Sequence, residues 1–378
     1  MDNAATTRVD ERVLEAMKPY FTKEFGNPSS LHGFGRAAHE VLEQSRTKIA
    51  SKIGAHPFEI IFTSGGTESN NLAIKGIAYA QKDKGKHIIT TRIEHPSILN
   101  PIRWLVKQGY DATYLDVDEY GLVSPDLVAH EIRKDTILVT VGHANNEVGT
   151  IQDIEDLGKI CSEKKVAFHT DACQSFTKEK IDVTEQHLDL VTLNSHKIHG
   201  PKGVGALYVK MGTKIEAVEH GGGHEKRMRS GTENIPSIVG FATASEILGE
   251  KEIQYMKNLR DKLISEIQKN IVETKLNGHP TKRLCNNANI SFKGVEGESL
   301  MLRLDAKGIA CSTASACSSK NLEPSYVLTA MGMPVEDTHG ALRMVVSHEN
   351  TKDEITYVVG TLVEEVGKLR AISPIWRG

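Results

Sequence analysis

The chain lacks long hydrophobic runs, which removes one class of protein from consideration. No stretch of eighteen apolar residues occurs in its 378 residues, so we expect no transmembrane helix. The first ten residues, MDNAATTRVD, have neither the basic start nor the apolar core of a signal peptide. We therefore expect a cytoplasmic protein without a membrane partner.

Cysteine and excess charge are also scarce. The five cysteines show neither CxxC spacing nor a paired framework, which favours a reducing compartment in which a special cysteine would be reactive rather than structural. Lys and Arg total 46 against 49 Asp and Glu. This near balance argues against direct nucleic-acid binding, and no metal site is predicted. Small molecules and proteins remain the expected partners.

What the sequence does contain, from about residue 59 to residue 210, is an alternation of short apolar runs and segments of helical period. The apolar runs are EIIFT, HIITT, ILVTV and VAFHT. This alternation is typical of βαβ units around a mostly parallel sheet with both faces covered. The segment therefore predicts an α/β domain.

A long helical pattern over 237–271 follows, with a polar middle (GEKEIQ) and no internal proline after its start. It predicts one helix that leaves the first domain and enters a second, with the boundary near 250. The later segments mix strands and helices as an α+β unit does. We assign 13–249 to a large α/β domain, and 1–12 with 250–378 to a smaller α+β domain.

Three motifs place chemically capable residues after strands. SGGTES holds Gly66 and Thr67 at a strand-to-helix turn, where free N–H groups favour a phosphate. FHTDACQS ends a strand in Asp171, and TLNSHKIHGPKG places Lys197 where burial could prepare it for a Schiff base. Each also has an ordinary interpretation: a capped turn, an N-cap aspartate and a surface lysine.

Two further residues, His95 in IEHPSI and Asn146 in HANNEVG, also follow apolar runs. Residues that follow parallel strands gather at one edge of the sheet, where ligand crevices form. A phosphate cradle, an acid, a stackable ring and a lysine are together what pyridoxal phosphate requires. The set therefore predicts that cofactor.

The order of motifs over essentially the whole chain resembles the group I cysteine desulfurases, which serve iron–sulfur cluster assembly and belong to the class V aminotransferases of pyridoxal-phosphate fold type I. The motifs that carry the resemblance are DNAATT, FGNPSS, FTSGGTESNN, HANNEVG, DACQS, SHKIHGPKGVGALY, HGGGHEKRMRSGTEN, SACSS, LEPSYVL and ALRM. The resemblance implies a large domain with a mostly parallel seven-stranded sheet and a smaller α+β domain.

The resemblance also implies roles for the cofactor-binding residues. Lys197 would hold the cofactor covalently and move the Cα proton, and Asp171 would keep the pyridine nitrogen protonated. His95 would stack on the ring and is a candidate for proton transfer with the substrate thiol. The remaining cofactor contacts would come from Gly66, Thr67, Gln174, His196 and, across a homodimer with shared active sites, Thr232.

The substrate would be L-cysteine, with Asn146 and Arg343 binding its carboxylate. Cys317 matches the family nucleophile, on a catalytic loop at about 310–322, and would accept sulfur as a persulfide while alanine leaves. The persulfide would pass to an iron–sulfur scaffold protein or another sulfur acceptor. Alternatives that remain open are a selenocysteine lyase, another fold type I aminotransferase, and a catalytically weak assembly scaffold.

Three features depart from the family pattern. Asn194 stands where a serine that binds the phosphate is usual, and Ser195 is its neighbour. His348 and Glu349 stand where a Gly-Arg pair is common. Cys311 has no counterpart, and we expect a buried packing residue at the end of a strand, with a resolving thiol for Cys317 as the alternative.

Overall fold

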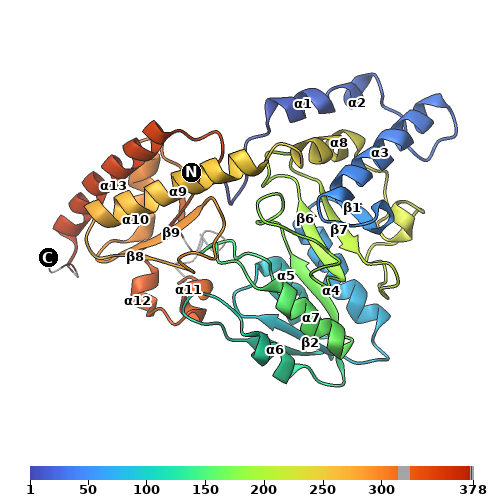
Figure 1. Ribbon diagram of the computed structural model, residues 1–378, viewed down its shortest axis with the longest axis horizontal. Coiled ribbons are helices and arrows are strands. Elements are labelled where there is room, and N and C mark those ends of the chain that lie inside the picture. Colours follow the sequence, from blue (N-terminus) through green and yellow to red (C-terminus); the bar gives the residue numbers. More distant parts are fainter. Residues whose placement is uncertain (314–323, 375, 377–378) are drawn as a thin grey trace.

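The computed structural model describes residues 1–313, 324–374 and 376. Its larger sheet has seven strands in the order β1-β7-β6-β5-β4-β2-β3, and β7 is antiparallel to both of its neighbours. The other pairings are parallel. These observations confirm the mostly parallel seven-stranded sheet (Figure 1). The strands are β1 (Ile60–Thr63), β2 (His87–Thr91), β3 (Asp111–Leu115), β4 (Thr136–Thr140), β5 (Ala167–Asp171), β6 (Leu190–Asn194) and β7 (Gly205–Val209).

The central strands are buried on both faces, as their short apolar runs predicted. In β2 and β4, Ile88 and Leu138 belong to one apolar cluster, and their neighbours Ile89 and Val139 belong to another on the opposite face. Successive side chains of a strand point to opposite faces, so each face needs its own cover. The cover comes from α3 (Gly33–Ser51), α4 (Gly66–Ala80), α5 (Pro96–Val106), α6 (Pro125–Glu131), α7 (Ile154–Lys164) and α8 (Ile235–Ala244).

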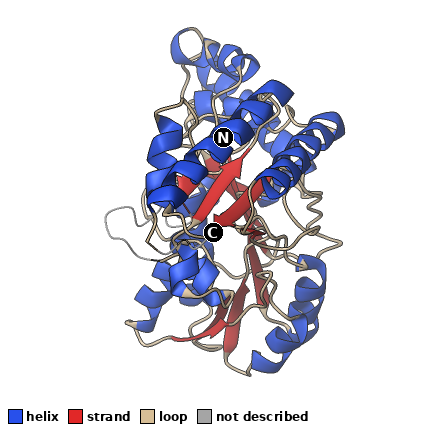
Figure 2. Cartoon of the chain, turned by 90° about the vertical axis from the view of Figure 1, so that its left-hand side faces the viewer, coloured by secondary structure: helices blue, strands red, loops and turns tan. Residues whose placement is uncertain are grey.

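A second, antiparallel sheet has the strand order β10-β11-β9-β8. Figure 2 shows the two sheets as separate red groups with helices around them. The small sheet consists of β8 (Thr274–Leu276), β9 (Asn287–Phe292), β10 (Ser312–Thr313) and β11 (Ala341–Val345). Around it lie α9 (Glu250–Asn270), α10 (Gly297–Asp305), α11 (Tyr326–Ala330), α12 (Val335–Thr338) and α13 (Lys352–Ile372).

The N-terminal residues connect the two parts. Asp2 forms a bridge with Val345 of β11, and the Asn3 side chain donates to the Val345 carbonyl. The chain then continues into α1 (Glu11–Met17) and α2 (Pro19–Thr22), and α1 packs against α8 of the larger part. The first residues therefore lie beside the small sheet. The domain ranges 13–249, and 1–12 with 250–378, stay a proposal.

The single helix expected over 237–271 is wrong, because the chain breaks between α8 and α9. Gly249 has an extended backbone and caps α9, and its N–H donates to the Glu252 side chain at 3.1 Å. α8 packs against α1 and α3, whereas α9 packs against α13. The helical period continues across the break, which hid it in the sequence. Among the described residues, no helix is long and apolar enough to cross a bilayer.

Candidate active site

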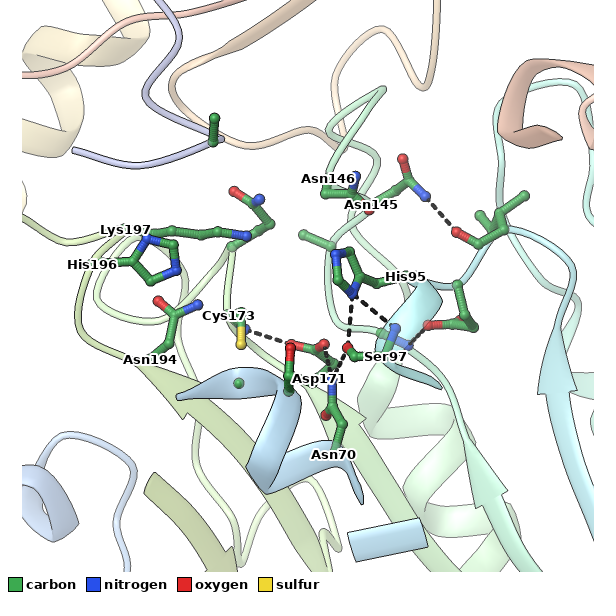
Figure 3. A pocket seen from close by; sticks show the side chains of 18 of the residues that line it. Asn70, His95, Ser97, Asn145, Asn146, Asp171, Cys173, Asn194, His196 and Lys197 are labelled. Carbon is green, nitrogen blue, oxygen red and sulfur yellow. Dashed lines mark hydrogen bonds between the residues drawn. The ribbon is translucent and has the colours of Figure 1, made fainter. Parts of the chain in front are cut away.

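A cavity of about 280 Å³ opens at the carboxyl ends of the parallel strands. Eight of the predicted residues line it, as their positions after successive strands suggested. They are Gly66, Thr67, His95, Asn146, Asp171, Gln174, His196 and Lys197. Figure 3 shows several of them converging on one space. In the described part of the chain, no group of three or more His, Cys, Asp or Glu side chains is placed to hold a metal ion.

Asp171, the last residue of β5, is held by two donors. The Asn70 amide nitrogen donates to Oδ2 at 2.7 Å, and the Cys173 N–H donates to Oδ1 at 2.9 Å. Burial opposes ionisation, but the hydrogen bonds from Cys173 and Asn70 outweigh it and lower the pKa of Asp171. The site therefore carries a fixed negative charge at its floor, as a partner for a protonated ring nitrogen must.

His95 occupies the N-cap of α5, where Pro96 begins the helix. Its Nδ1 accepts from the Ser97 N–H at 3.1 Å and lies 2.7 Å from the Ser97 hydroxyl. Burial lowers the pKa of His95; the negative Asp171 opposes this shift and the positive Lys197 adds to it. The ring is therefore neutral at physiological pH and is held rigidly at a helix terminus.

Lys197 lies in the turn between β6 and β7, and Figure 3 shows its side chain pointing into the cavity. Its carbonyl oxygen accepts a hydrogen bond from Lys178 Nζ at 3.1 Å, and Lys178 also donates to the Gln174 carbonyl at 2.9 Å. Burial lowers the pKa of Lys178 to about 8. A buried lysine thus fixes the backbone of the turn that presents Lys197.

The phosphate cradle predicted at the start of α4 is built tightly. Gly65 has φ 149°, a backbone conformation that favours glycine. A Cβ added at Gly66 would lie 2.6 Å from Cys173 Sγ, so a larger residue would force the Cys173 side chain to shift. The helix N-terminus offers N–H groups to an anion, and His196 lies nearby with its pKa lowered to about 4 by burial. These residues fit the phosphate end of pyridoxal phosphate.

Asn194 stands where the family usually has a serine, and the structure shows which of Asn194 and Ser195 faces the cavity. Asn194 lines the cavity, and its buried Oδ1 has no hydrogen-bond partner within the described part of the chain. Ser195 is fully buried and does not line the cavity. Asn194 rather than Ser195 therefore faces the cradle.

Arg343, on β11 of the second sheet, does not line the cavity itself but contacts Asn146, which does. Its Nη1 donates to the Asn146 carbonyl at 3.0 Å, and its Nη2 donates to Asp2 Oδ1 at 3.1 Å. Its Nε is buried and, among the described residues, has no acceptor. A buried donor without an acceptor is costly, so this atom is a candidate to bind a ligand oxygen.

Besides Arg343, two predicted residues are not placed at this cavity. Thr232 is exposed on the loop before α8, as expected for a residue that would serve a neighbouring subunit. Cys317 lies outside the described residues, so its role stays a prediction.

Cys311 is buried in the apolar core, as expected, although it lies immediately before β10 rather than at the end of a strand. Burial raises the pKa of its thiol to about 12. Reactive thiols need an accessible thiolate, so these properties oppose the resolving role and favour packing. The four described cysteines are all buried and free.

His348, which departs from the family pattern, does not line the cavity but contacts His199 and Asp10. Its ring packs edge-on against His199 with centroids 4.4 Å apart, and its Nε2 lies 4.0 Å from Asp10 Oδ2. Glu349 lies 4.0 Å from His199 Nδ1. This cluster joins the turn after Lys197 to the chain that follows β11.

The sequence reasoning missed several polar residues of the site. Asn70 lies on α4 one turn after Thr67, and Ser97 lies two residues after His95. These short spacings from predicted site residues are the signal in the sequence that indicates both residues. Glu94 also lines the cavity, and burial raises its pKa to about 7.

Comparisons with known proteins agree with this geometry. The aminotransferase class-V family model matches residues 1–358. The chain is 50% identical to a protein named cysteine desulfurase IscS from Methanosarcina thermophila, over 99% of this chain and 93% of that one. It is 49% identical to one of the same name from Dictyoglomus turgidum, over 99% and 96%.

Two solved structures are similar throughout. One is a NifS-like protein (TM-score 0.91, 36% identity, 97% of this chain and 98% of that chain). The other is SspA in complex with cysteine (TM-score 0.84, 37% identity, 93% and 99%). The fold, the cavity and these relatives agree, and the chain belongs to the aminotransferase class-V family, among its pyridoxal-phosphate-dependent cysteine desulfurases.

Proposed function

We propose that this chain converts L-cysteine to L-alanine and that Cys317 receives the sulfur as a persulfide. The observation that carries the proposal is the convergence of Lys197, Asp171 and His95 in one cavity, whose lining residue Asn146 is held by Arg343. The reaction balances without an outside oxidant. The substrate C–S bond breaks, an S–S bond forms on Cys317, and a proton completes the methyl group of alanine.

Pyridoxal phosphate, when bound, supplies an electron-withdrawing ring that acidifies the Cα proton and weakens the bond to sulfur. In the proposal, Lys197 holds the cofactor and moves the Cα proton, and the charge of Asp171 keeps the ring nitrogen protonated. Gly66, Thr67 and His196 hold the phosphate. Gln174 contacts the phenolic oxygen, and His95 covers the ring face.

The substrate carboxylate is assigned to Asn146 and Arg343. A guanidinium N–H forms a charge-assisted hydrogen bond with a carboxylate, which also sets the direction of the amino acid. Arg343 keeps its Nη1 on the Asn146 carbonyl and its Nη2 on Asp2, and its Nε is the donor that lacks an acceptor among the described residues. The carboxylate would complete this set.

A homodimer with shared sites is part of the proposal. The segment from α2 to the start of α3, which Figure 1 draws at the edge of the molecule, exposes four large apolar side chains: Phe21, Phe25, Leu31 and Phe34. Exposed apolar clusters of this kind favour a protein partner. Thr232 is exposed as well, so a second copy could receive it at the phosphate.

The acceptor class and the compartment complete the proposal. We assign the persulfide to an iron–sulfur scaffold protein or another thiol acceptor, and the protein to the cytoplasm. The four described cysteines are free thiols, which supports a reducing compartment.

The test compares three proteins reconstituted with cofactor: wild type, Cys317→Ala, and Cys311→Ala as the matched control. Wild type and Cys311→Ala should release alanine and sulfide from L-cysteine in the presence of a thiol reductant, whereas Cys317→Ala should not. Full turnover by Cys317→Ala would refute the nucleophile and favour an aminotransferase. A faster reaction with selenocysteine would indicate a lyase for that substrate, and no alanine from wild type would favour a scaffold.

A further inference from the structure

A chain of hydrogen bonds runs from Asp171 through Asn70 and Ser97 to the ring of His95 (Figure 3). We propose that Asn70 and Ser97 are positioning residues that hold His95 as the neutral tautomer with its proton on Nε2. His95 would then act as a hydrogen-bond donor, not a base, toward the substrate sulfur. The donor role rests on the proposed function, whereas the tautomer does not.

The backbone of α5 decides which ring nitrogen lacks a proton. The Ser97 N–H can only donate, and it points at His95 Nδ1 at 3.1 Å. A proton on Nδ1 would set two N–H groups against each other. Nδ1 is therefore the acceptor nitrogen, and in the neutral ring the proton belongs to Nε2.

The orientation of the Asn70 amide gives the same answer independently. The ionised carboxylate of Asp171 can only accept, so Asn70 must turn its Nδ2 toward Oδ2, at 2.7 Å. The same Nδ2 gives its second hydrogen to Ser97 Oγ at 2.8 Å. The Ser97 hydroxyl already accepts there, so its own hydrogen is free for His95 Nδ1, 2.7 Å away.

Burial makes this arrangement stable. Asn70 is fully buried and Ser97 is 8% exposed, so water does not compete for their hydrogen bonds. The Asn70 Oδ1 is buried without a partner among the described residues. The Asn70 amide therefore leaves its oxygen without a donor while both hydrogens of its Nδ2 are bonded, one to Asp171 and one to Ser97. Asn70 and Ser97 lie on α4 and α5, which pack against each other.

The charged groups around His95 do not reverse this assignment. Glu94 precedes it in the chain, Asp171 faces it from β5, and Lys197 faces it from the turn after β6. The Glu94 carboxylate accepts hydrogen bonds from the Thr91 hydroxyl and the Gly142 N–H, so it is directed to these groups and not to His95. Asp171 acts on His95 through Asn70 and Ser97, by orienting donors toward Nδ1.

The consequence concerns the direction of proton flow. A ring with hydrogen on Nε2 and two donors on Nδ1 has no free lone pair with which to take a proton from a thiol. It can instead donate a hydrogen bond from Nε2 to an anionic sulfur. Of the roles that the expected proton transfer with the substrate thiol leaves open to His95, the proposal selects that of donor.

The direct test is nitrogen NMR of the holoenzyme labelled with ¹⁵N-histidine, with His95→Gln used to assign the ring. Wild type should show a pyridine-type shift for Nδ1 and a pyrrole-type shift for Nε2 near neutral pH. The reverse pattern would overturn the proposal. Alanine release measured on the same samples separates the two claims, because the tautomer can be present when the proposed activity is absent.

Variants test the positioning role. Ser97→Ala and Asn70→Ala should give mixed tautomers and an upward shift of the His95 titration midpoint. They should lower kcat roughly fivefold, the effect of one lost hydrogen bond of about 1 kcal/mol, with little change in KM. Ser97→Thr keeps the hydroxyl and should restore the wild-type spectrum, and Asn71→Ala on the same helix is the matched control. An unchanged spectrum and pH profile in Ser97→Ala would refute the role. If Ser97→Ala does not fold, the wild-type spectrum still decides the tautomer.

Discussion

Replacing Arg343 with lysine should weaken substrate capture while leaving the fold intact. Lysine keeps one positive charge but loses the planar fork that places one donor on the Asn146 carbonyl and one on Asp2, and that leaves Nε without an acceptor among the described residues. The bonds that position the side chain and the bond to the carboxylate cannot be made together by a single ammonium group.

The size of the effect follows from that geometry. The lost contact to the substrate is a hydrogen bond between charged groups, which contributes about 2 to 3 kcal/mol. This corresponds to roughly a 30- to 150-fold fall in kcat/KM. Most of the fall should appear in KM, because the carboxylate does not change charge during the reaction.

The assay is the rate of alanine formation over a range of L-cysteine concentrations, in wild type and Arg343→Lys. Arg303→Lys is the matched control, because Arg303 is partly exposed on α10 and pairs with Glu365, away from the cavity. A fall of less than threefold in Arg343→Lys, with its melting temperature unchanged, would show that Arg343 does not bind the carboxylate.

Three other outcomes are expected. Gly66→Ala should weaken cofactor retention in dialysis, because its Cβ would lie 2.6 Å from Cys173 Sγ, and adding Cys173→Ala should restore part of the loss; no loss in Gly66→Ala would contradict the tight cradle. Burial lowers the pKa of His169 from a usual 6.5 to about 4 in the folded state. Between these pH values the unfolded state binds more protons, so the free energy of unfolding decreases by about 3 kcal/mol as the pH is lowered from 6.5 to 4. Urea midpoints measured from pH 7.5 to 5 should therefore fall less steeply in His169→Gln, and parallel slopes would refute this. Burial raises the pKa of Glu147 to about 7, so its charge costs stability as pH rises from 4.5 through 7; Glu147→Gln should melt higher than wild type at pH 8, and a lower melting temperature would contradict the reasoning.

Much of the fold was predictable because burial leaves a strong pattern in sequence. Strands covered on both faces are mostly apolar, and the strands before His95 and at Asp171 are largely buried, with His and Thr side chains among their apolar residues. The gathering of residues at one sheet edge followed from parallel strand direction alone. The break before Gly249 was not predictable in the same way, because both helices keep one period and differ only in what they pack against.

The missed residues were missed for a physical reason. Asn70 and Ser97 are 27 positions apart in the sequence, and their hydrogen bond exists only because α4 packs against α5. Motif spacing along one element cannot show such a pair. The residues that the sequence did locate are those set by the ends of strands, whose relative places the sheet determines.

The position of Arg343 makes the cavity sensitive to how the two sheets are seated on one another. The arginine belongs to the small sheet, whereas the carbonyl that holds its Nη1 belongs to the loop after β4 of the large one. A sliding displacement between the sheets would lengthen this bond and move the guanidinium relative to Asn146, which lines the cavity. Affinity for the amino acid would then depend on how the two sheets are aligned. A substitution in the contact between the two sheets, far from the cavity, would change KM without altering any residue of the site.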